Sequence, residues 1–176
     1  LTRFLLSGVT ALTRATREAL DEHGVGWAGE AIAPYVLRAD FFHMSNEVSI
    51  NPICPDNNRI LIGGSLLSFC SKEEHFELLT NLGVAIVELS GNHNNDYGHD
   101  AYRETLTWYR ERGIATIGGG NSVEESRSPL ILSYHDNQIA MVSCNWAGPY
   151  YALQNDAPQA RGGIRPGAAY CDIDWL

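Results

Sequence analysis

The sequence predicts an α/β fold with a mixed sheet, and two observations lead to that prediction. Short apolar runs rich in β-branched residues alternate with segments whose apolar residues recur every three or four positions, which is the pattern of strands connected by helices. Near the end, residues 130–134 and 138–144 flank the turn residues Asp136 and Asn137, as in an antiparallel hairpin. We therefore expect the hairpin to add an antiparallel element to an otherwise parallel sheet.

Length and charge narrow the class of protein. With 176 residues, 44% of them hydrophobic, the chain is long enough for one well-buried core, so we expect a single domain over residues 1–176. A net charge of −9 argues against nucleic acid or an anionic membrane surface as the main partner, since both need a basic face. No apolar run approaches the ~20 residues of a membrane span. The chain starts at Leu1 without a methionine, which leaves cytoplasmic and exported locations both open.

The first part of the chain predicts two strands and two helices. Helical spacing ends at Gly24 in one segment and before Asp40 in the other, and a loop rich in Pro and Asn follows the second strand. The strands are expected at residues 4–12 and 41–48, the helices at 13–23 and 29–38, and the loop at 51–59.

The central part predicts two more strand and helix pairs. Ser71 and Glu74 form a capping box that begins a helix ending near Leu82, and Ser122 with Glu125 forms a second one. Strands are expected at residues 84–89 and 114–117, and a helix at 99–112. The three glycines 118–120 indicate a close approach of the backbone to a neighbouring group.

Cysteines and most histidines suggest structural roles only. The four cysteines are widely separated and contain no CxxC pair, which supports neither a zinc knuckle nor a redox dithiol, and Cys70 and Cys144 are expected to be buried thiols. His23, His75 and His99 lie on or beside helices and are expected to be solvated.

The loop after residues 84–89 carries the most informative side chains. It places Asn92, His93 and Asp96 directly after a buried strand, and ligands in open α/β sheets bind beyond the carboxyl ends of the strands. An amide oxygen, an imidazole nitrogen and a carboxylate together form a plausible set for metal binding or acid–base chemistry. The alternative is that Asn92, Asn95 and Asp96 only make turn and cap hydrogen bonds.

Polar residues also end the other predicted strands, at 8–10 and 45–47. If these strands are parallel neighbours, their ends converge on one edge, with Glu47 and Asn92 as metal ligands and His93 as a general acid. Asn145, with His135 or Asp136 nearby, would join from the hairpin. A solvated carboxylate is the alternative for Glu47.

Residues 145–167 are rich in Gly, Pro, Ala and Asn and predict a long loop. Arg161 and Arg165 in this loop would meet an anionic substrate, while a surface role is the alternative.

Residues 79–145 contain an ordered set of short motifs. An N-H-x-x-D-x-G loop follows a strand, and after it come a helix with Thr-Leu and a terminal Gly-Ile, a Gly-rich turn, an acidic pair before a proline, and a hairpin. In this sequence they are Asn92, His93, Asp96, Gly98, Thr105, Leu106, Gly113, Ile114, Gly118 to Gly120, Glu124, Glu125 and Pro129. In this order and spacing the stretch resembles the capsule-synthesis CapA (poly-gamma-glutamate synthesis) family of the calcineurin-like metallophosphoesterase superfamily. Weaker similarity extends upstream to Ala39, Asp40 and Glu47.

The resemblance implies an αββα sandwich with a divalent metal ion (Mn, Zn or Fe) at the strand ends. It also implies an anionic small-molecule or polymer substrate, and a role in making, trimming or anchoring a bacterial polymer such as poly-gamma-glutamate. Taken with the residue patterns above, the site residues would be His93 and Asp96 for catalysis, Glu47 and Asn92 for the metal, and Asn145, Arg161 and Arg165 for the substrate.

Two departures separate this sequence from the family pattern. The family's opening Gly-Asp, whose Asp binds metal, is Gly8-Val9 here, and the Asn of its N-x-E is Ser45. Two hypotheses therefore stand: a metal-dependent hydrolase, and a non-catalytic scaffold that binds a polymer or small anion. We also expect that the C-terminal part of the fold is missing, which would expose a sheet edge and favour a homo-oligomer.

Overall fold

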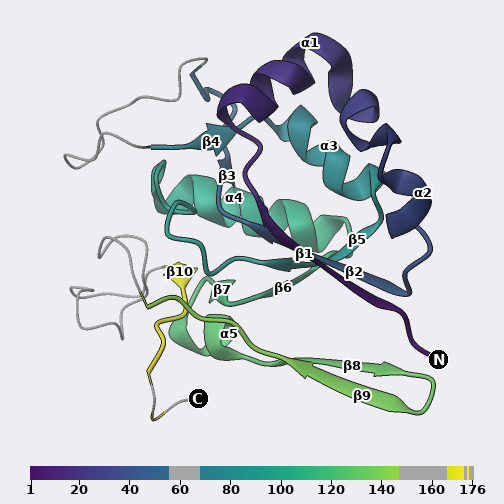
Figure 1. Ribbon diagram of the computed structural model, residues 1–176. Helices are drawn as coiled ribbons and strands as arrows, with labels where there is room; N and C mark the ends of the chain where they lie inside the picture. Colours follow the sequence, from purple (N-terminus) through teal and green to yellow (C-terminus); the bar gives the residue numbers. More distant parts are fainter. Residues whose placement is uncertain (56–67, 147–165, 173, 175–176) are drawn as a thin grey trace.

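A four-stranded parallel sheet forms the centre of the molecule (Figure 1). The fold is that of a computed structural model, which describes residues 1–55, 68–146, 166–172 and 174. In spatial order the strands are β1 (Phe4–Thr10), β2 (Phe41–Asn46), β5 (Val84–Glu88) and β6 (Ala115–Ile117). The α/β class and the parallel adjacency of the first three strands are as predicted.

Shorter elements surround this sheet. The helices are α1 (Arg14–Glu30), α2 (Ala33–Val36), α3 (Glu73–Asn81), α4 (Gly98–Glu111) and α5 (Val123–Arg127). The remaining strands pair two by two: β3 (Ser49–Ile50) with β4 (Cys70–Ser71), β7 (Gly119–Gly120) with β10 (Gly167–Ala168), and β8 (Leu130–Tyr134) with β9 (Asn137–Met141). The helices of the described residues are not long and apolar enough for any of them to cross a membrane.

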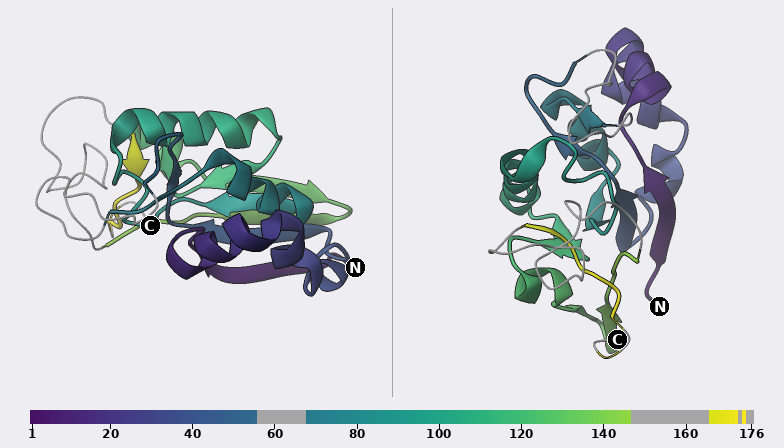
Figure 2. Two further views of the ribbon diagram at one scale, coloured as in Figure 1. Left: turned by 90° about the horizontal axis from the view of Figure 1, so that it is seen from above. Right: turned by 90° about the vertical axis from the view of Figure 1, so that its left-hand side faces the viewer.

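The main core lies between one face of the sheet and the helices α1, α3 and α4, which lie side by side over the sheet in Figure 2. Strand β2 alternates in burial, so that Phe42 and Met44 face this core. Phe76 of α3 packs edge-on against Trp108 of α4, at 5.4 Å between ring centroids. Trp108 and Tyr109 are thus packing residues.

The predicted mixed sheet is wrong, because the hairpin β8–β9 forms a two-stranded sheet of its own. Its tip contacts the amino ends of β1 and β2: the Tyr134 hydroxyl donates to Asp40, and the Asn137 amide donates to Thr2. His135 and Asp136, in the turn between β8 and β9, are therefore far from the carboxyl edge that they were expected to join.

Element boundaries differ from the prediction in the first third of the chain. The first helix is interrupted at Gly24, which has φ of 81°, but helical structure resumes at once and continues to Glu30. The second strand ends at Asn46, where Nδ2 of that residue donates to the Val48 carbonyl and redirects the backbone into β3.

The capping box at Ser71 and the solvated His75 are both wrong. Ser71 belongs to β4, and its hydroxyl is 3.0 Å from Nδ1 of His75 instead of capping α3. His75 is only 2% exposed, and its Nε2 lies 2.9 Å from Asp21 of α1. The predicted cap at Ser122 is confirmed, since its side chain accepts from the Glu125 N–H, while the Glu125 carboxylate accepts from the N–H of Asn121.

The prediction of buried free thiols is also wrong. Two disulfides join Cys54 to Cys70 and Cys144 to Cys171. The first pair meets because β3 runs beside β4, and the second because backbone hydrogen bonds join Asn145 to the segment 169–171. Both contacts are made by the tertiary fold and leave no signature in local cysteine spacing.

Candidate functional site

Glu47 and the loop after β5 meet at the carboxyl edge of the sheet. Gly91 approaches Glu47 so closely that an added Cβ would lie 2.6 Å from Cγ of Glu47 and 3.0 Å from its Cα. A residue with a side chain would not fit at position 91 without displacing Glu47. The predicted convergence of Glu47 with the loop of Asn92 and His93 at one end of the sheet is thereby confirmed.

The loop itself is fixed by asparagine side chains. Nδ2 of Asn94 donates to the carbonyls of Asn46 and Leu89, both at 3.2 Å, and Nδ2 of Asn95 donates to the Pro166 carbonyl at 3.0 Å. Nδ2 of Asn95 therefore has the structural hydrogen-bonding role that was the alternative to ligand binding. These bonds tie the loop to the ends of β2 and β5.

His93 and Asp96 form a closely hydrogen-bonded pair. Nδ1 of His93 lies 2.7 Å from Oδ2 of Asp96, which also accepts the Phe69 N–H at 2.8 Å. The Asp96 side chain is fully buried, whereas 23% of the His93 side chain is exposed. Because Nδ1 is engaged with the carboxylate, Nε2 is the ring nitrogen that can serve a ligand.

The hydrogen bond to Asp96 raises the pKa of His93 above its ordinary value of 6.5, against the opposing effect of partial burial. A nearby carboxylate, Glu47, acts in the same direction. The pair therefore favours an imidazolium with its remaining N–H available, which suits a proton donor or a binding group for an anion.

We expect His93 to titrate above pH 6.5, and above His43, whose pKa is lowered by burial. Since the folded state raises the pKa, the protonated pair stabilises the fold below about pH 6.5, and this contribution is lost as the pH rises through the raised value. An NMR titration of both imidazole rings measures the order. A His93 that titrates below His43 would contradict the pairing with Asp96.

Glu47 and Asn92 lie beside this pair without protein partners. Both side chains are half-buried, and neither makes a hydrogen bond or ion pair within residues 1–55, 68–146, 166–172 and 174. Half-buried polar side chains that have no such partner there are available to bind a ligand. Asn145 lies in the segment joined to residues 169–171, and Arg161 and Arg165 fall outside the described residues.

Comparison with known proteins identifies the family. The family described as bacterial capsule synthesis protein PGA_cap matches residues 3–171. The chain belongs to the PGA_cap family. It is also similar to the capsule biosynthesis protein CapA of Bacillus anthracis, with 19% identity over 133 residues. That similarity covers 76% of this chain and 32% of CapA, so the chain spans about a third of the relative's length.

Membership of PGA_cap confirms the predicted capsule-synthesis resemblance. Whether this chain holds metal is decided by the donors at its own site. At the carboxyl edge the predicted donors are Glu47 and Asn92. Val9, near the end of β1, is 60% exposed, is in register with Ser45 and offers no ligand atom. Glu47 and Asn92 alone, one carboxylate and one amide, do not fit a two-metal centre.

Within the described residues, the one group of three His, Cys, Asp or Glu side chains with metal-like spacing lies elsewhere. It consists of Asp21, Glu74 and His75, between α1 and α3. Lys72 already binds Asp21 at 2.8 Å, and Ser71 binds the other nitrogen of His75. This cluster is a polar contact between two helices.

Sequence analysis missed Glu88 of this PGA_cap chain. Its carboxylate accepts from the Ser45 hydroxyl at 2.6 Å, the Ser90 N–H at 2.5 Å and the Ser143 hydroxyl at 2.9 Å. Three donors stabilise a half-buried charge and join β2, β5 and the segment after β9. A signal was present, because Glu88 interrupts the apolar run 84–89 at its carboxyl end.

Proposed function

We propose that this protein acts in the synthesis of a bacterial capsular polymer and that Glu47, Asn92 and His93 form its site for an anionic substrate. The pairing of His93 with the buried Asp96, beside two side chains that have no hydrogen-bond or ion-pair partner among the described residues, is the observation that carries the proposal. We also propose that the fold is an αββα sandwich of metallophosphoesterase type, in which the four-stranded sheet is one of the two sheets.

The reaction that this geometry supports best is hydrolysis of a phosphoester or of an amide in a polymer such as poly-gamma-glutamate. As water attacks the phosphorus or the carbonyl carbon, protonated His93 would donate the proton on Nε2 to the leaving oxygen or nitrogen, while Asp96 keeps the ring oriented through Nδ1. The proton lost by the attacking water then restores the imidazolium. A carboxylate-rich polymer would also be attracted by the imidazolium. We assign no step to a metal ion, since the described donors do not complete a centre.

We also predict that Glu47 and Asn92 bind a divalent ion (Mn, Zn or Fe). If these residues hold an ion, Glu47→Gln and Asn92→Ala should each lower the metal content of the purified protein and its turnover together. Metal content by elemental analysis and hydrolysis of a phosphodiester and of polyglutamate are measured for each variant and the parent.

Matched control variants lie at the opposite end of the sheet. Glu111→Gln and Asn81→Ala change the same chemical groups at exposed positions that precede β6 and β5. They should leave metal content and turnover unchanged. Equal losses in control and site variants would show a general effect on folding instead of a ligand role.

A second candidate function is a scaffold that binds the polymer without cleaving it, and Val9 in place of the family Asp favours it. In that case the parent would hold no metal and hydrolyse neither substrate, but calorimetry would detect binding of polyglutamate that His93→Ala weakens. A parent that neither binds nor cleaves polyglutamate or a phosphodiester would exclude both functions.

A further inference from the structure

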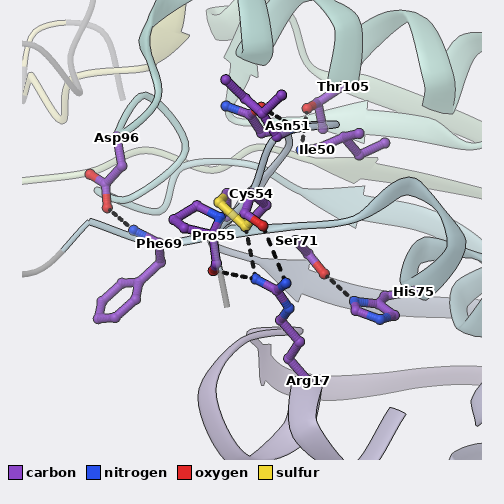
Figure 3. The surroundings of a disulfide bond; sticks show 12 residues. Arg17, Ile50, Asn51, Cys54, Pro55, Phe69, Ser71, His75, Asp96 and Thr105 are labelled. Atoms are coloured by element: carbon purple, nitrogen blue, oxygen red, sulfur yellow. Dashed lines mark hydrogen bonds between the residues drawn. A yellow bond between two sulfur atoms is a disulfide. The ribbon is translucent and has the colours of Figure 1, made fainter. Parts of the chain in front are cut away.

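The Cys54–Cys70 disulfide is connected to the His93–Asp96 pair through the neighbouring residue Phe69. Phe69 directly precedes Cys70, and it touches both members of the pair: its N–H donates to Asp96, and its ring lies edge-on to the His93 ring, 4.7 Å between centroids. Figure 3 shows the disulfide, Phe69 and its hydrogen bond to Asp96 in one view. The backbone position of Phe69 thus decides how the carboxylate is held.

The disulfide is anchored to helix α1 by Arg17. Nη1 of Arg17 donates to the Cys54 sulfur at 3.2 Å and to the Pro55 carbonyl at 2.6 Å, and Nη2 donates to the Cys54 carbonyl at 3.2 Å (Figure 3). Arg17 is only 2% exposed, so these bonds form away from water. At Cys54, then, the disulfide is fixed to helix α1 by buried hydrogen bonds.

Apart from the disulfide, sheet pairing holds the segment of Phe69 through few hydrogen bonds. Strand β4 pairs with β3 over two residues, and one further bond joins the Asn51 N–H to the Ser71 carbonyl at 2.9 Å. Asp96 depends on this segment, because its second oxygen, Oδ1, is buried without a hydrogen-bond partner in the described part of the chain. Loss of the Phe69 N–H would leave the buried carboxylate with His93 alone.

We propose that Phe69 is a positioning residue for His93 and that the Cys54–Cys70 disulfide holds Phe69 in that position. This inference rests on the proposed role of His93 in the site. It makes the orientation of the imidazole depend on the covalent bond between Cys54 and Cys70. The second disulfide, Cys144–Cys171, is linked to the loop through the segment of Pro166, which accepts from Asn95, and not through Phe69, so it serves as the control.

The test compares two double variants, Cys54→Ala with Cys70→Ala and Cys144→Ala with Cys171→Ala, as metal-free proteins at one fixed pH. Hydrogen exchange of the Phe69 amide and the ¹⁵N signals of the His93 ring are recorded by NMR. A hydrogen bond to a charged group contributes more than the free-energy equivalent of a tenfold change, so the first variant should exchange this amide at least about tenfold faster. Its His93 Nδ1–H signal should also weaken, while the control keeps both readings of the parent.

A second variant, Phe69→Leu, keeps the disulfide and the backbone N–H but removes the aromatic ring. The His93 ring protons should then shift, because they lose the neighbouring aromatic current, while the amide at position 69 stays protected. This variant tests the contact between Phe69 and His93 independently of the disulfide.

Three results would overturn the proposal: unchanged signals in the folded Cys54/Cys70 variant, equal changes in both double variants, or unchanged His93 ring signals in Phe69→Leu. Failure of the proposed function is seen separately, as a parent without turnover or polymer binding. The NMR readings of the parent do not depend on that outcome.

Discussion

Replacement of His93 by alanine is expected to lower turnover of the cleaved substrate by roughly 10²–10⁴-fold, the range typical of a lost general acid. The expected loss follows from the position of Nε2, which is the ring nitrogen left available when Nδ1 binds Asp96 at 2.7 Å. Metal content should stay at the parental level, because His93 is placed beside the proposed ligands and not among them. Steady-state kinetics and elemental analysis of the same preparation measure both quantities.

His23→Ala is the control for this experiment. His23 lies on α1, is 41% exposed and, in the part of the chain that the structure describes, contacts its neighbours Glu22 and Trp27, so its loss should leave turnover unchanged. If His93→Ala retains the parental rate over the whole pH range, His93 is not the proton donor.

Gly119→Ala is expected to lower the free energy of unfolding by roughly 3 kcal/mol, at the upper end of the usual cost of overpacking. A Cβ at this position would overlap the Tyr102 hydroxyl and lie 2.8 Å from Cβ and 2.9 Å from the carbonyl oxygen of Leu89. Tyr102 and Leu89 are both fully buried, so neither can move aside easily. Urea unfolding of the variant and the parent measures the difference.

Gly8→Ala serves as the matched control within β1. An added Cβ at Gly8 has nothing within 4 Å, and the residue is exposed. This substitution should be neutral or stabilising by roughly 0.5 kcal/mol, since alanine restricts the unfolded chain more than glycine does. If both substitutions lowered the free energy of unfolding equally, the close contacts at Gly119 would not contribute to the effect.

Much of the sheet and of its carboxyl edge could be predicted because the signals are local. An apolar β-branched run followed by polar residues predicts both a strand and the end at which it stops, and parallel order then brings Glu47 beside the loop of Asn92 and His93. The glycines 118–120 were likewise interpretable, since three in a row have few uses other than close approach.

The features that could not be predicted depend on register and on distant partners. Cys54 meets Cys70 only because β3 runs beside β4, and His75 is buried only because Asp21 of α1 packs against α3. The sequence predicted the hairpin, but not its separation from the main sheet. That separation depends on tertiary packing, which the spacing of apolar residues along the chain does not reveal. Ser71 has the spacing of a helix cap, but it pairs in strand β4 and its hydroxyl contacts His75 instead.

The Cys54–Cys70 bond also changes the distance along the chain that folding must bridge. Strand β2 pairs with β5 across 43 positions, from Ser45 to Glu88, and the disulfide lies inside this crossover with its two cysteines 16 positions apart. Once formed, it bypasses more than a third of the segment whose ends must find each other. By loop-closure entropy the gain is only about 0.4 kcal/mol, so the central strand pair should form at most about twice as fast in the oxidised chain.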